Sequence, residues 1–318
     1  MGKKIIVTGC AGFIGSHLTE ALLFEGHTIY GLDNLSTGTR ANMQNFIYQS
    51  NFHFFQVDIS NFDDLINTMM AIDDAQMVYH LAAMGSVPRS IDTPLDSFKN
   101  NVVATRNLLD VCHAKSIDYL IFTSSSSVYG EQDSDLKSVD MSPNPQSPYA
   151  TYKMMCEQLL DLYSMTYGMY TCSFRLFNVY GPRQAIGSAY AAVVPNICES
   201  LILDKPFSLY GNGKQKRDFT YVDNVVEILW QCVDTPPRQS LYNIGCNRSV
   251  DIAQLMTWFE GIAEKVLDVH HEPTRKGDVK NSLASISDLQ SDFAYIPDTS
   301  IRTFLETFRY YQDFFSAK

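Results

Sequence analysis

The sequence lacks the features that mark secreted, membrane-spanning and nucleic-acid-binding proteins. Its seven cysteines form no C-x-x-C pair, which excludes a disulfide framework and a zinc site of the usual spacing. Lys and Arg number 24 against 35 Asp and Glu, so the net charge is −11 and we expect no basic face for nucleic acid. No apolar run approaches the ~20 residues that span a membrane. We therefore expect a cytoplasmic chain with reduced thiols, no metal site, and no nucleic-acid or membrane partner.

The chain also lacks internal repeats, low-complexity segments and any linker rich in Gly or Ser. Its 318 residues correspond to about two domains at ~150 residues each. Turn signals become denser after Arg175, as at Gly181-Pro182 and Pro236-Pro237. We expect one domain over residues 1–175 and a smaller lobe over residues 176–318. Part of the later chain should return to the first domain, and the two should share a core.

The first half contains short apolar runs that alternate with longer amphipathic segments. The runs predict strands at Lys4–Thr8, Thr28–Leu32, Phe52–Val57, Met77–His80, Tyr119–Thr123 and Thr171–Arg175. The segments between them predict helices at Gly12–Glu25, Phe62–Met70, Asp96–Ala114 and Pro148–Tyr167. Strands that alternate with helices of this length form right-handed βαβ units. The expected fold class is therefore α/β, a Rossmann-type doubly wound parallel sheet with a smaller C-terminal lobe.

A glycine-rich loop follows the first predicted strand. Gly9, Gly12 and Gly15 have the spacing G-x-x-G-x-x-G between that strand and a helix. Glycine permits a tight turn and the close approach of a pyrophosphate, which the helix N-terminus attracts through free N–H groups and its dipole. Asp33 stands 18 residues after the last glycine, where a carboxylate accepts hydrogen bonds from ribose hydroxyls and repels a 2′-phosphate. The pattern predicts NAD binding; the alternative for Asp33 is the cap of a turn.

A second motif contains the side chains of a proton-transfer site. Ser124–Ser127 follow a predicted strand, and Tyr149 and Lys153 stand four residues apart on one face of the next helix. Lowering a tyrosine pKa from about 10 to about 7 requires about 4 kcal/mol. An ammonium group about 4 Å away supplies roughly this energy at an effective dielectric constant of about 20. We therefore expect Lys153 to lower the pKa of Tyr149, and a serine hydroxyl to hold the reacting oxygen.

Together these motifs resemble the extended short-chain dehydrogenase/reductase family, in particular its nucleotide-sugar epimerases. The resemblance runs from the glycine loop to the stretch 275–278, and it implies Ser125, Tyr149 and Lys153 as catalytic residues, with Tyr149 as the base. It also implies contacts with NAD from Gly9, Gly12, Phe13, Ile14, Gly15, Asp33, Asn34, Asp58, Ile59, Leu81, Ala82, Ala83, Asn101, Ser124, Tyr149, Lys153 and Phe177.

The resemblance further implies a UDP-sugar site. Ser126 and Ser127 stand where the family's dehydratases and decarboxylases carry acidic residues, so oxidation followed by re-reduction is favoured over elimination. Arg217 and Arg275 are expected to pair with the diphosphate, the alternative for each being a surface salt bridge. The substrate contacts implied are Ser86, Val87, Ser125, Ser126, Tyr149, Asn178, Ala192, Val193, Tyr210, Arg217, Arg275, Asp278 and Ser282.

Local features favour an N-acetylated sugar. Residues 85–90 and 189–195 resemble the subgroup that acts on UDP-N-acetylhexosamines. Ser282 stands four residues after Asp278, where epimerases restricted to glucose and galactose usually carry tyrosine, and a serine leaves room for a 2-acetamido group. The implied activity is NAD-dependent 4-epimerisation of UDP-GlcNAc and UDP-GalNAc, with UDP-Glc and UDP-Gal also candidates, through a transient 4-keto sugar.

Three alternatives remain open at this level. The first is the same reaction on a UDP-N-acetylhexosamine uronate, whose carboxylate Arg89, Ser86 and Ser90 could receive. The second is an oxidoreductase that releases a 4-keto product, and the third is a non-catalytic NAD-binding sensor. The family also implies a homodimer through the helices at 96–114 and 148–167. Their apolar side chains fit either that contact or the core, among them Leu108, Leu109, Met155, Leu159 and Tyr163.

Overall fold

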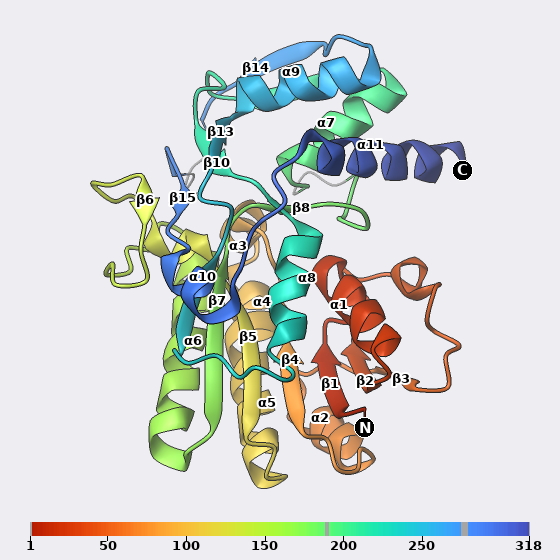
Figure 1. The fold of residues 1–318 in the computed structure, drawn as a ribbon, viewed down its shortest axis with the longest axis vertical. Helices are drawn as coiled ribbons and strands as arrows, with labels where there is room; N and C mark the ends of the chain where they lie inside the picture. The colour runs from red at the N-terminus through yellow and green to blue at the C-terminus, as the bar shows by residue number, and fades with distance from the viewer. Residues whose placement is uncertain (1, 188–190, 275–278, 318) are drawn as a thin grey trace.

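The computed structural model describes residues 2–187, 191–274 and 279–317. Its centre is a seven-stranded, fully parallel sheet in the order β12-β7-β5-β4-β1-β2-β3 (Figure 1). The strand order reverses between β1 and β4, which is the pattern of a doubly wound sheet. The strands are β1 Lys4–Thr8, β2 Thr28–Asp33, β3 Phe52–Gln56, β4 Met77–His80, β5 Tyr119–Ser125, β7 Tyr170–Leu176 and β12 Leu241–Ile244. The predicted fold class is confirmed.

Helices cover both faces of this sheet. Alternate side chains of one strand enter different cores: Ile5 and Val7 pack in one hydrophobic cluster, and Ile6 packs in the other. The first cluster contains α1 and α8, and the second contains α2, α5 and α6. The bounds are α1 Phe13–Phe24, α2 Phe62–Met70, α3 Val87–Asp92, α4 Pro94–Phe98, α5 Ala104–Ala114, α6 Pro148–Tyr167 and α8 Val222–Gln231. Short helical turns are η1 Arg40–Met43, η2 Lys99–Val103 and η3 Ser126–Tyr129.

The prediction of a single helix at Asp96–Ala114 is wrong in detail. The structure has α4, then η2 with π-helical geometry, then α5. Asn101 lies within η2, and its buried side chain donates to the Ser97 carbonyl at 2.7 Å and accepts from the Met84 N–H at 3.2 Å. π-Helical turns of this kind are frequent at functional sites. The wider turn therefore ties the loop after β4 to the helix that follows.

The C-terminal lobe lies at the carboxyl end of the sheet, at the top of Figure 1. It is built from short strand pairs and three longer helices, and its buried side chains belong to the same hydrophobic cluster as α1 and α8. Its helices are α7 Val193–Leu203, α9 Ile252–Ala263 and α11 Ile301–Ser316, whereas α10 Ser287–Phe293 packs against β12 of the central sheet (Figure 1). The minor strands of the chain are β6 Leu136–Lys137, β8 Val179–Tyr180, β9 Phe207–Tyr210, β10 Lys216–Asp218, β11 Thr220–Tyr221, β13 Ser249–Asp251, β14 Val269–Glu272 and β15 Leu283–Ala284.

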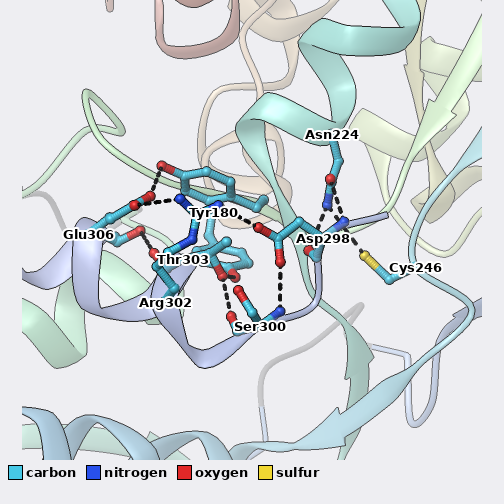
Figure 2. Close-up of polar contacts among 10 residues, drawn as sticks. Tyr180, Asn224, Cys246, Asp298, Ser300, Arg302, Thr303 and Glu306 are labelled. Atoms are coloured by element: carbon cyan, nitrogen blue, oxygen red, sulfur yellow. Dashed lines mark hydrogen bonds and ion pairs between the residues drawn. The ribbon is translucent and has the colours of Figure 1, made fainter. Parts of the chain in front are cut away.

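Later parts of the chain pack directly on the sheet. β12 extends it beyond β7, and α8 lies against α1 (Figure 1). Figure 2 shows how the segment before α11 is held: the Asn224 side chain of α8 exchanges two hydrogen bonds with the backbone of Asp298, at 2.8 and 3.0 Å. Nearby, the Tyr180 and Thr303 hydroxyls lie 2.6 Å apart. Across the ranges 2–187, 191–274 and 279–317, no helix is both long enough and apolar enough for a membrane span.

Candidate active site

A cavity of about 560 Å³ lies at the carboxyl end of the sheet, beside the point where the strand order reverses. Ligands of doubly wound sheets bind at this position. Most of the residues named from the sequence line it. Those predicted for NAD and found there are Gly9, Gly12, Phe13, Ile14, Gly15, Asp33, Asn34, Asp58, Ile59, Leu81, Ala82, Ala83, Ser124, Tyr149 and Lys153.

Each of the three glycines in the loop is favoured at its position for a different physical reason. A Cβ on Gly15 would lie 2.0 Å from the Gly9 carbonyl oxygen, so the first turn of α1 packs on the loop only without a side chain. Gly9 has a φ of +76°, and a Cβ there would lie 2.7 Å from the Ala82 nitrogen. Gly12 begins α1, and no side chain caps the helix. The uncapped N–H groups of the first turn face a roomy cavity, and this fits the pyrophosphate of a dinucleotide.

Two carboxylates end the next two strands. Asp33, the last residue of β2, accepts hydrogen bonds from the Leu35 N–H at 2.7 Å and the Ala11 N–H at 3.0 Å. Asp33 thus holds the glycine loop to β2 while it lines the cavity, so the turn role and the ligand role are compatible. Burial raises the pKa of the Asp33 carboxyl, and the two N–H donors oppose this shift. Asp58 accepts from the N–H and hydroxyl of Ser60, at 2.9 and 2.6 Å. Both positions fit the adenosine half of NAD.

Two predicted NAD contacts do not line the cavity. Phe177 is fully buried in the hydrophobic cluster, with its ring centroid 6.1 Å from that of Tyr129. Asn101 is buried and its side chain is engaged with Ser97 and Met84. Both residues instead support residues that line the cavity: Asn101 bonds with Met84, and Phe177 stands between Leu176 and Asn178 in the chain.

The serine, tyrosine and lysine of the predicted catalytic set all line the cavity. Ser125 ends β5, and its hydroxyl accepts hydrogen bonds from the N–H and hydroxyl of Ser127. Ser147 caps α6 by accepting from the Ala150 N–H at 3.2 Å, which places Tyr149 in the first turn. The Tyr149 N–H donates to the Ser90 hydroxyl at 3.0 Å, so α3 also holds this turn. The local structure therefore brings the catalytic candidates together.

The structure differs from the expectation that Lys153 lowers the pKa of Tyr149. Burial raises the pKa of Tyr149 to about 12, and a hydrogen bond with Ser125 opposes this shift. Burial also lowers the pKa of Lys153 to about 8. The Lys153 ammonium donates to the Thr123 carbonyl at 2.7 Å and lies 4.5 Å from the centre of the Phe122 ring. In the protein alone, desolvation is the largest cause of both pKa shifts, and neither group is among the causes of the other's shift.

A second cavity, of about 270 Å³, adjoins the first in the C-terminal lobe. The two cavities share five lining residues, which are Asn178, Val179, Gln184, Ala192 and Arg217. Tyr210 and Val193 line the second cavity, and Ser86, Val87, Ser125, Ser126, Tyr149 and Ser282 line the first. All predicted substrate residues that the structure describes therefore line one cavity or both. Arg275 and Asp278 lie outside the described residues.

Arg217 is held by the backbone of a distant segment. Its guanidinium donates to the Val279 carbonyl at 2.7 Å and to the Lys280 carbonyl at 3.0 Å. Ser282 is buried, and its N–H donates to the Lys216 carbonyl at 3.1 Å. These contacts bring β10 and residues 279–282 together at the wall between the cavities.

Sequence reasoning missed two buried carboxylates near the site. Glu157 pairs with Arg175 at 2.7 Å and accepts from the Ser124 hydroxyl. Asp218 accepts from the Cys246 N–H at 2.8 Å and the Ala284 N–H at 3.0 Å, and burial raises its pKa to about 6. The spacing of four residues from Tyr149 to Lys153 continues to Glu157, a signal that could have found it. No local signal marks Asp218, because its partners are far away in the sequence.

Comparisons with known proteins agree with this geometry. The model of the NAD dependent epimerase/dehydratase family matches residues 5–245. A UDP-glucose 4-epimerase of Mycolicibacterium smegmatis is 33% identical over 280 residues, which cover 88% of each chain. A UDP-N-acetylglucosamine 4-epimerase of Methanobrevibacter ruminantium M1, solved with UDP-N-acetylmuramic acid, is 34% identical with a TM-score of 0.92, covering 100% of this chain and 99% of that one. A UDP-glucuronic acid 4-epimerase of Bacillus cereus, solved with UDP-glucuronic acid and NAD, is 31% identical with a TM-score of 0.90, covering 98% and 99%.

Proposed function

The chain belongs to the NAD-dependent epimerase/dehydratase family, and from this premise we propose that it is a UDP-sugar 4-epimerase whose preferred pair is UDP-GlcNAc and UDP-GalNAc. The broader activity is supported by relatives named as UDP-sugar 4-epimerases, which this chain matches along most or nearly all of their length. The choice of sugar rests on residues of this chain. UDP-Glc and UDP-Gal are the proposed secondary substrates.

The cofactor of this family is NAD, and the residues present fit it. When bound, NAD accepts the hydrogen of sugar C4 as hydride and returns it, so the cycle needs no external oxidant. The uncapped start of α1 at Gly12 is proposed to hold the pyrophosphate, and Asp33 the ribose hydroxyls. The absence of a side chain at Gly12 leaves the backbone open to this approach.

The proton of the sugar 4-hydroxyl is proposed to pass to Tyr149. The pKa of Tyr149 is about 12 in the protein alone, so this phenol needs positive charge beside it to act as a base near neutral pH. Lys153 follows one helical turn later and remains mostly protonated at neutral pH, because its pKa is about 8. Ser125 is proposed to hold the reacting oxygen by a hydrogen bond. The 4-keto sugar then turns about its bonds to the diphosphate and receives the hydride on the other face.

The division between the two cavities supports a firm hold on UDP and a loose hold on the sugar. Arg217 stands at their junction, anchored to residues 279 and 280. A guanidinium there suits a diphosphate, because it can bind two oxygens at once. Tyr210 is proposed to pack on the uracil in the second cavity. A sugar that must rotate between two hydride transfers then occupies the larger first cavity.

One observation carries the choice of sugar. Ser282 lines the first cavity with a small side chain, and its backbone is fixed by the Lys216 carbonyl. The space that a larger side chain would take there is proposed to receive the 2-acetamido group.

The test is to incubate the purified protein with UDP-GlcNAc, UDP-Glc and UDP-GlcNAcA, without added NAD, and to resolve the products. We expect interconversion of UDP-GlcNAc and UDP-GalNAc with the highest kcat/KM, and slower conversion of UDP-Glc. Conversion of none of the three would overturn the epimerase proposal. Conversion of the uronate alone would move the substrate to the acidic sugar.

The uronate is the second candidate, because a UDP-glucuronic acid epimerase is among the similar structures. Its carboxylate would need a cation at the sugar end of the site. Arg89 lies on α3, where its N–H donates to the capping Ser86 hydroxyl, and it does not line the first cavity. This position favours a structural role for Arg89 and an uncharged sugar.

We also propose that the protein forms a homodimer through α6. Leu108, Leu109 and Tyr163 are buried in the chain's own core, so they are not available for a contact between subunits. The exposed large hydrophobic side chains of α6 are instead Leu162, Met165 and Tyr167, which are 49%, 80% and 50% exposed. A Leu162→Glu/Met165→Glu variant should run as a monomer where the wild type runs as a dimer in size-exclusion chromatography with light scattering. A monomeric wild type would contradict the proposal.

A further inference from the structure

A buried ion pair lies directly behind the catalytic candidates. The Glu157 carboxylate of α6 meets the Arg175 guanidinium of β7 in a two-point contact, with Nε–Oε1 at 2.9 Å and Nη2–Oε2 at 2.7 Å. The two side chains are 9% and 3% exposed. A charged pair this deep gains little net stability, because desolvation cancels most of the attraction. Its presence therefore calls for a reason other than folding energy.

The pair is the centre of a chain of polar contacts that crosses the sheet. The Ser124 hydroxyl of β5 donates to Glu157 Oε1 at 2.5 Å. Arg175 lies over the Tyr129 ring, 4.5 Å from its centre, and the Tyr129 hydroxyl donates to the Asn243 side chain of β12 at 2.7 Å. We refer to Ser124, Glu157, Arg175, Tyr129 and Asn243 as the buried network. It links α6 to three neighbouring strands below the cavity.

The same helix face carries the catalytic candidates. Tyr149, Lys153 and Glu157 follow one another at intervals of four residues on α6. Their partners are three consecutive residues at the end of β5: Tyr149 bonds with Ser125, Lys153 donates to the Thr123 carbonyl, and Glu157 accepts from Ser124. Three helical turns are thus matched to three strand residues. Glu157 is the member of this series that does not line the cavity.

We propose that Glu157 is a positioning residue for the epimerisation: its carboxylate, held by Arg175, fixes Ser124 and thereby keeps the Ser125 hydroxyl in register with Tyr149 and Lys153. This inference rests on the proposed catalytic roles of those three residues. Proton transfer and hydride transfer both require reacting groups within a few tenths of an ångström of their productive positions. The Ser127 N–H and hydroxyl hold the Ser125 hydroxyl locally, and the contact between Glu157 and Ser124 fixes the end of β5 against α6.

One further observation favours a functional reason for the pair. Within residues 2–187, 191–274 and 279–317, Arg175 Nη1 is one of a few buried polar atoms that make no hydrogen bond. An unsatisfied buried donor is costly, and an apolar pair of similar volume would remove that cost. The chain keeps the arginine nevertheless, and its two bonded nitrogens are the ones that orient Glu157.

Glu157 also contributes to the charge around Lys153. The groups that face Lys153 are Cys156 and Glu157 on its own helix, His80 on β4, and the Phe122 ring and Thr123 carbonyl on β5. Burial keeps His80 neutral, with its pKa lowered to about 3. Burial lowers the pKa of Lys153, and the charge of Glu157 opposes that shift. Removing this charge should lower the Lys153 pKa further, so the ammonium is lost at a lower pH.

The experiment compares Glu157→Gln with two matched controls. Asp161→Asn removes a negative charge one turn further along α6, from an exposed residue that feels the charges of Glu157 and Arg175 but forms no hydrogen bond with the buried network. Asn224→Ala removes a buried polar anchor of the C-terminal lobe, drawn in Figure 2, that does not line the first cavity. The readouts are kcat and KM for UDP-GlcNAc, the pH profile of kcat, the thermal midpoint, and the dissociation constant of NADH measured by fluorescence.

We expect Glu157→Gln to lower kcat about 100-fold, to leave the KM for the UDP-sugar within about threefold, and to move the alkaline limb of the profile to lower pH. NADH binding should remain within about threefold, because the glycine loop is untouched. Asp161→Asn should keep the wild-type kcat and KM, because it leaves the contact between Glu157 and Ser124 in place. Asn224→Ala should lower the thermal midpoint without moving the pH profile. Wild-type kcat in folded Glu157→Gln would overturn the proposal.

A double variant, Glu157→Leu/Arg175→Met, covers the case in which one unpaired buried charge unfolds the chain. Apolar replacement of both partners is usually compatible with folding. The variant should be folded, bind NADH and have a kcat reduced at least 100-fold, and a wild-type kcat would again overturn the proposal. Tyr149→Phe is measured in parallel: activity retained in that variant rejects the proposed catalytic set. Activity lost there but kept in the Glu157 variants rejects only the inference about Glu157.

Discussion

The two sides of the cavity are built in different ways. On the side of β1 to β4, the lining comes from the loops that directly follow these four consecutive strands. On the side of the C-terminal lobe, the lining comes from segments far apart in the sequence, such as Arg217 and Ser282 against Ser86 and Ser125. The first side is therefore local in sequence and the second is not.

The difference matches what each side must recognise. A pyrophosphate is well served by N–H groups at a helix start, and three glycines and one helix provide them. A sugar nucleotide needs side chains of chosen size and charge in a particular arrangement, and these are held by contacts such as that of Arg217 with the Val279 and Lys280 carbonyls. Substitutions on the first side should affect the cofactor, and substitutions on the second should affect the choice of substrate.

Tyr149, where the two sides meet, should give the largest effect. Tyr149→Phe removes the proposed base and should lower kcat at least about 1,000-fold while NADH still binds. The matched control is Tyr152→Phe on the same helix, whose ring packs edge-on against Phe98 at 5.4 Å. This control should keep most of the activity. Comparable losses in both variants would remove Tyr149 from its special role.

Gly15→Ala should weaken binding of the cofactor, because it changes the loop on the cofactor side of the cavity. The added Cβ would lie 2.0 Å from the Gly9 carbonyl oxygen, so the loop or α1 must shift. We expect the NADH dissociation constant to rise at least about tenfold, with a loss of about 1–3 kcal/mol in the free energy of unfolding. Gly261→Ala on α9, where a Cβ meets no atom within 4 Å, should change neither quantity adversely. Equal NADH affinity in the wild type and Gly15→Ala would show that the loop tolerates the displacement.

Ser282→Tyr should affect the substrate side selectively. The larger ring fills the space proposed for the 2-acetamido group, so kcat/KM for UDP-GlcNAc should fall about tenfold or more relative to UDP-Glc, as expected for a steric block in a shaped pocket. The control is the same variant with UDP-Glc, together with NADH binding and the thermal midpoint. Equal losses on both sugars would remove the steric argument for an N-acetylated substrate.

The smallest effect should be a pH dependence of stability on the substrate side. Burial raises the pKa of the Asp218 carboxyl to about 6, above its usual value of about 3.9 in an unfolded chain. Between these values the unfolded chain binds fewer protons, so the contribution of Asp218 to the free energy of unfolding is full below about pH 4 and falls until about pH 6. Urea unfolding at pH 5 and pH 7 should show this loss in the wild type and a smaller one in Asp218→Asn. An Asp251→Asn control, at the start of α9, should keep the wild-type pH dependence.

The N-terminal half could be predicted in some detail from the sequence. The strands at Lys4–Thr8 and Met77–His80 and the helices at Phe62–Met70 and Pro148–Tyr167 have the predicted bounds. These elements begin at strong local signals, such as Ser147 and Pro148 before α6. The break at η2 escaped prediction because it depends on contacts between Asn101 and the loop at Met84. β12 escaped for a similar reason, since its pairing with β7 is set by the rest of the sheet.

The residues of the candidate site also differ in how far they could be predicted from the sequence. Motif spacing led to Gly12, Asp33, Tyr149 and Lys153, and the family resemblance led to Ser125; all five line one cavity. Spacing did not show that Phe177 and Asn101 lie behind the cavity wall, since burial depends on neighbours far away in the chain. The pKa of Tyr149 was expected to fall and instead rises, because charge attraction can be read from the interval of four residues but desolvation cannot.

The sequence by itself determined the parallel sheet, the dinucleotide loop and the order of the serine, tyrosine and lysine motifs, since each can be recognised from the spacing of residues and segments along the chain. Only the tertiary structure decided how these groups meet the second half of the chain. Arg217, Ser282 and Asp218 acquire their positions from backbone partners about thirty to seventy residues away, and Glu157 acquires its position from Arg175 across the sheet. Local signals act through short-range sterics and hydrogen bonds, whereas a buried charge is stable only where the whole fold supplies its partner.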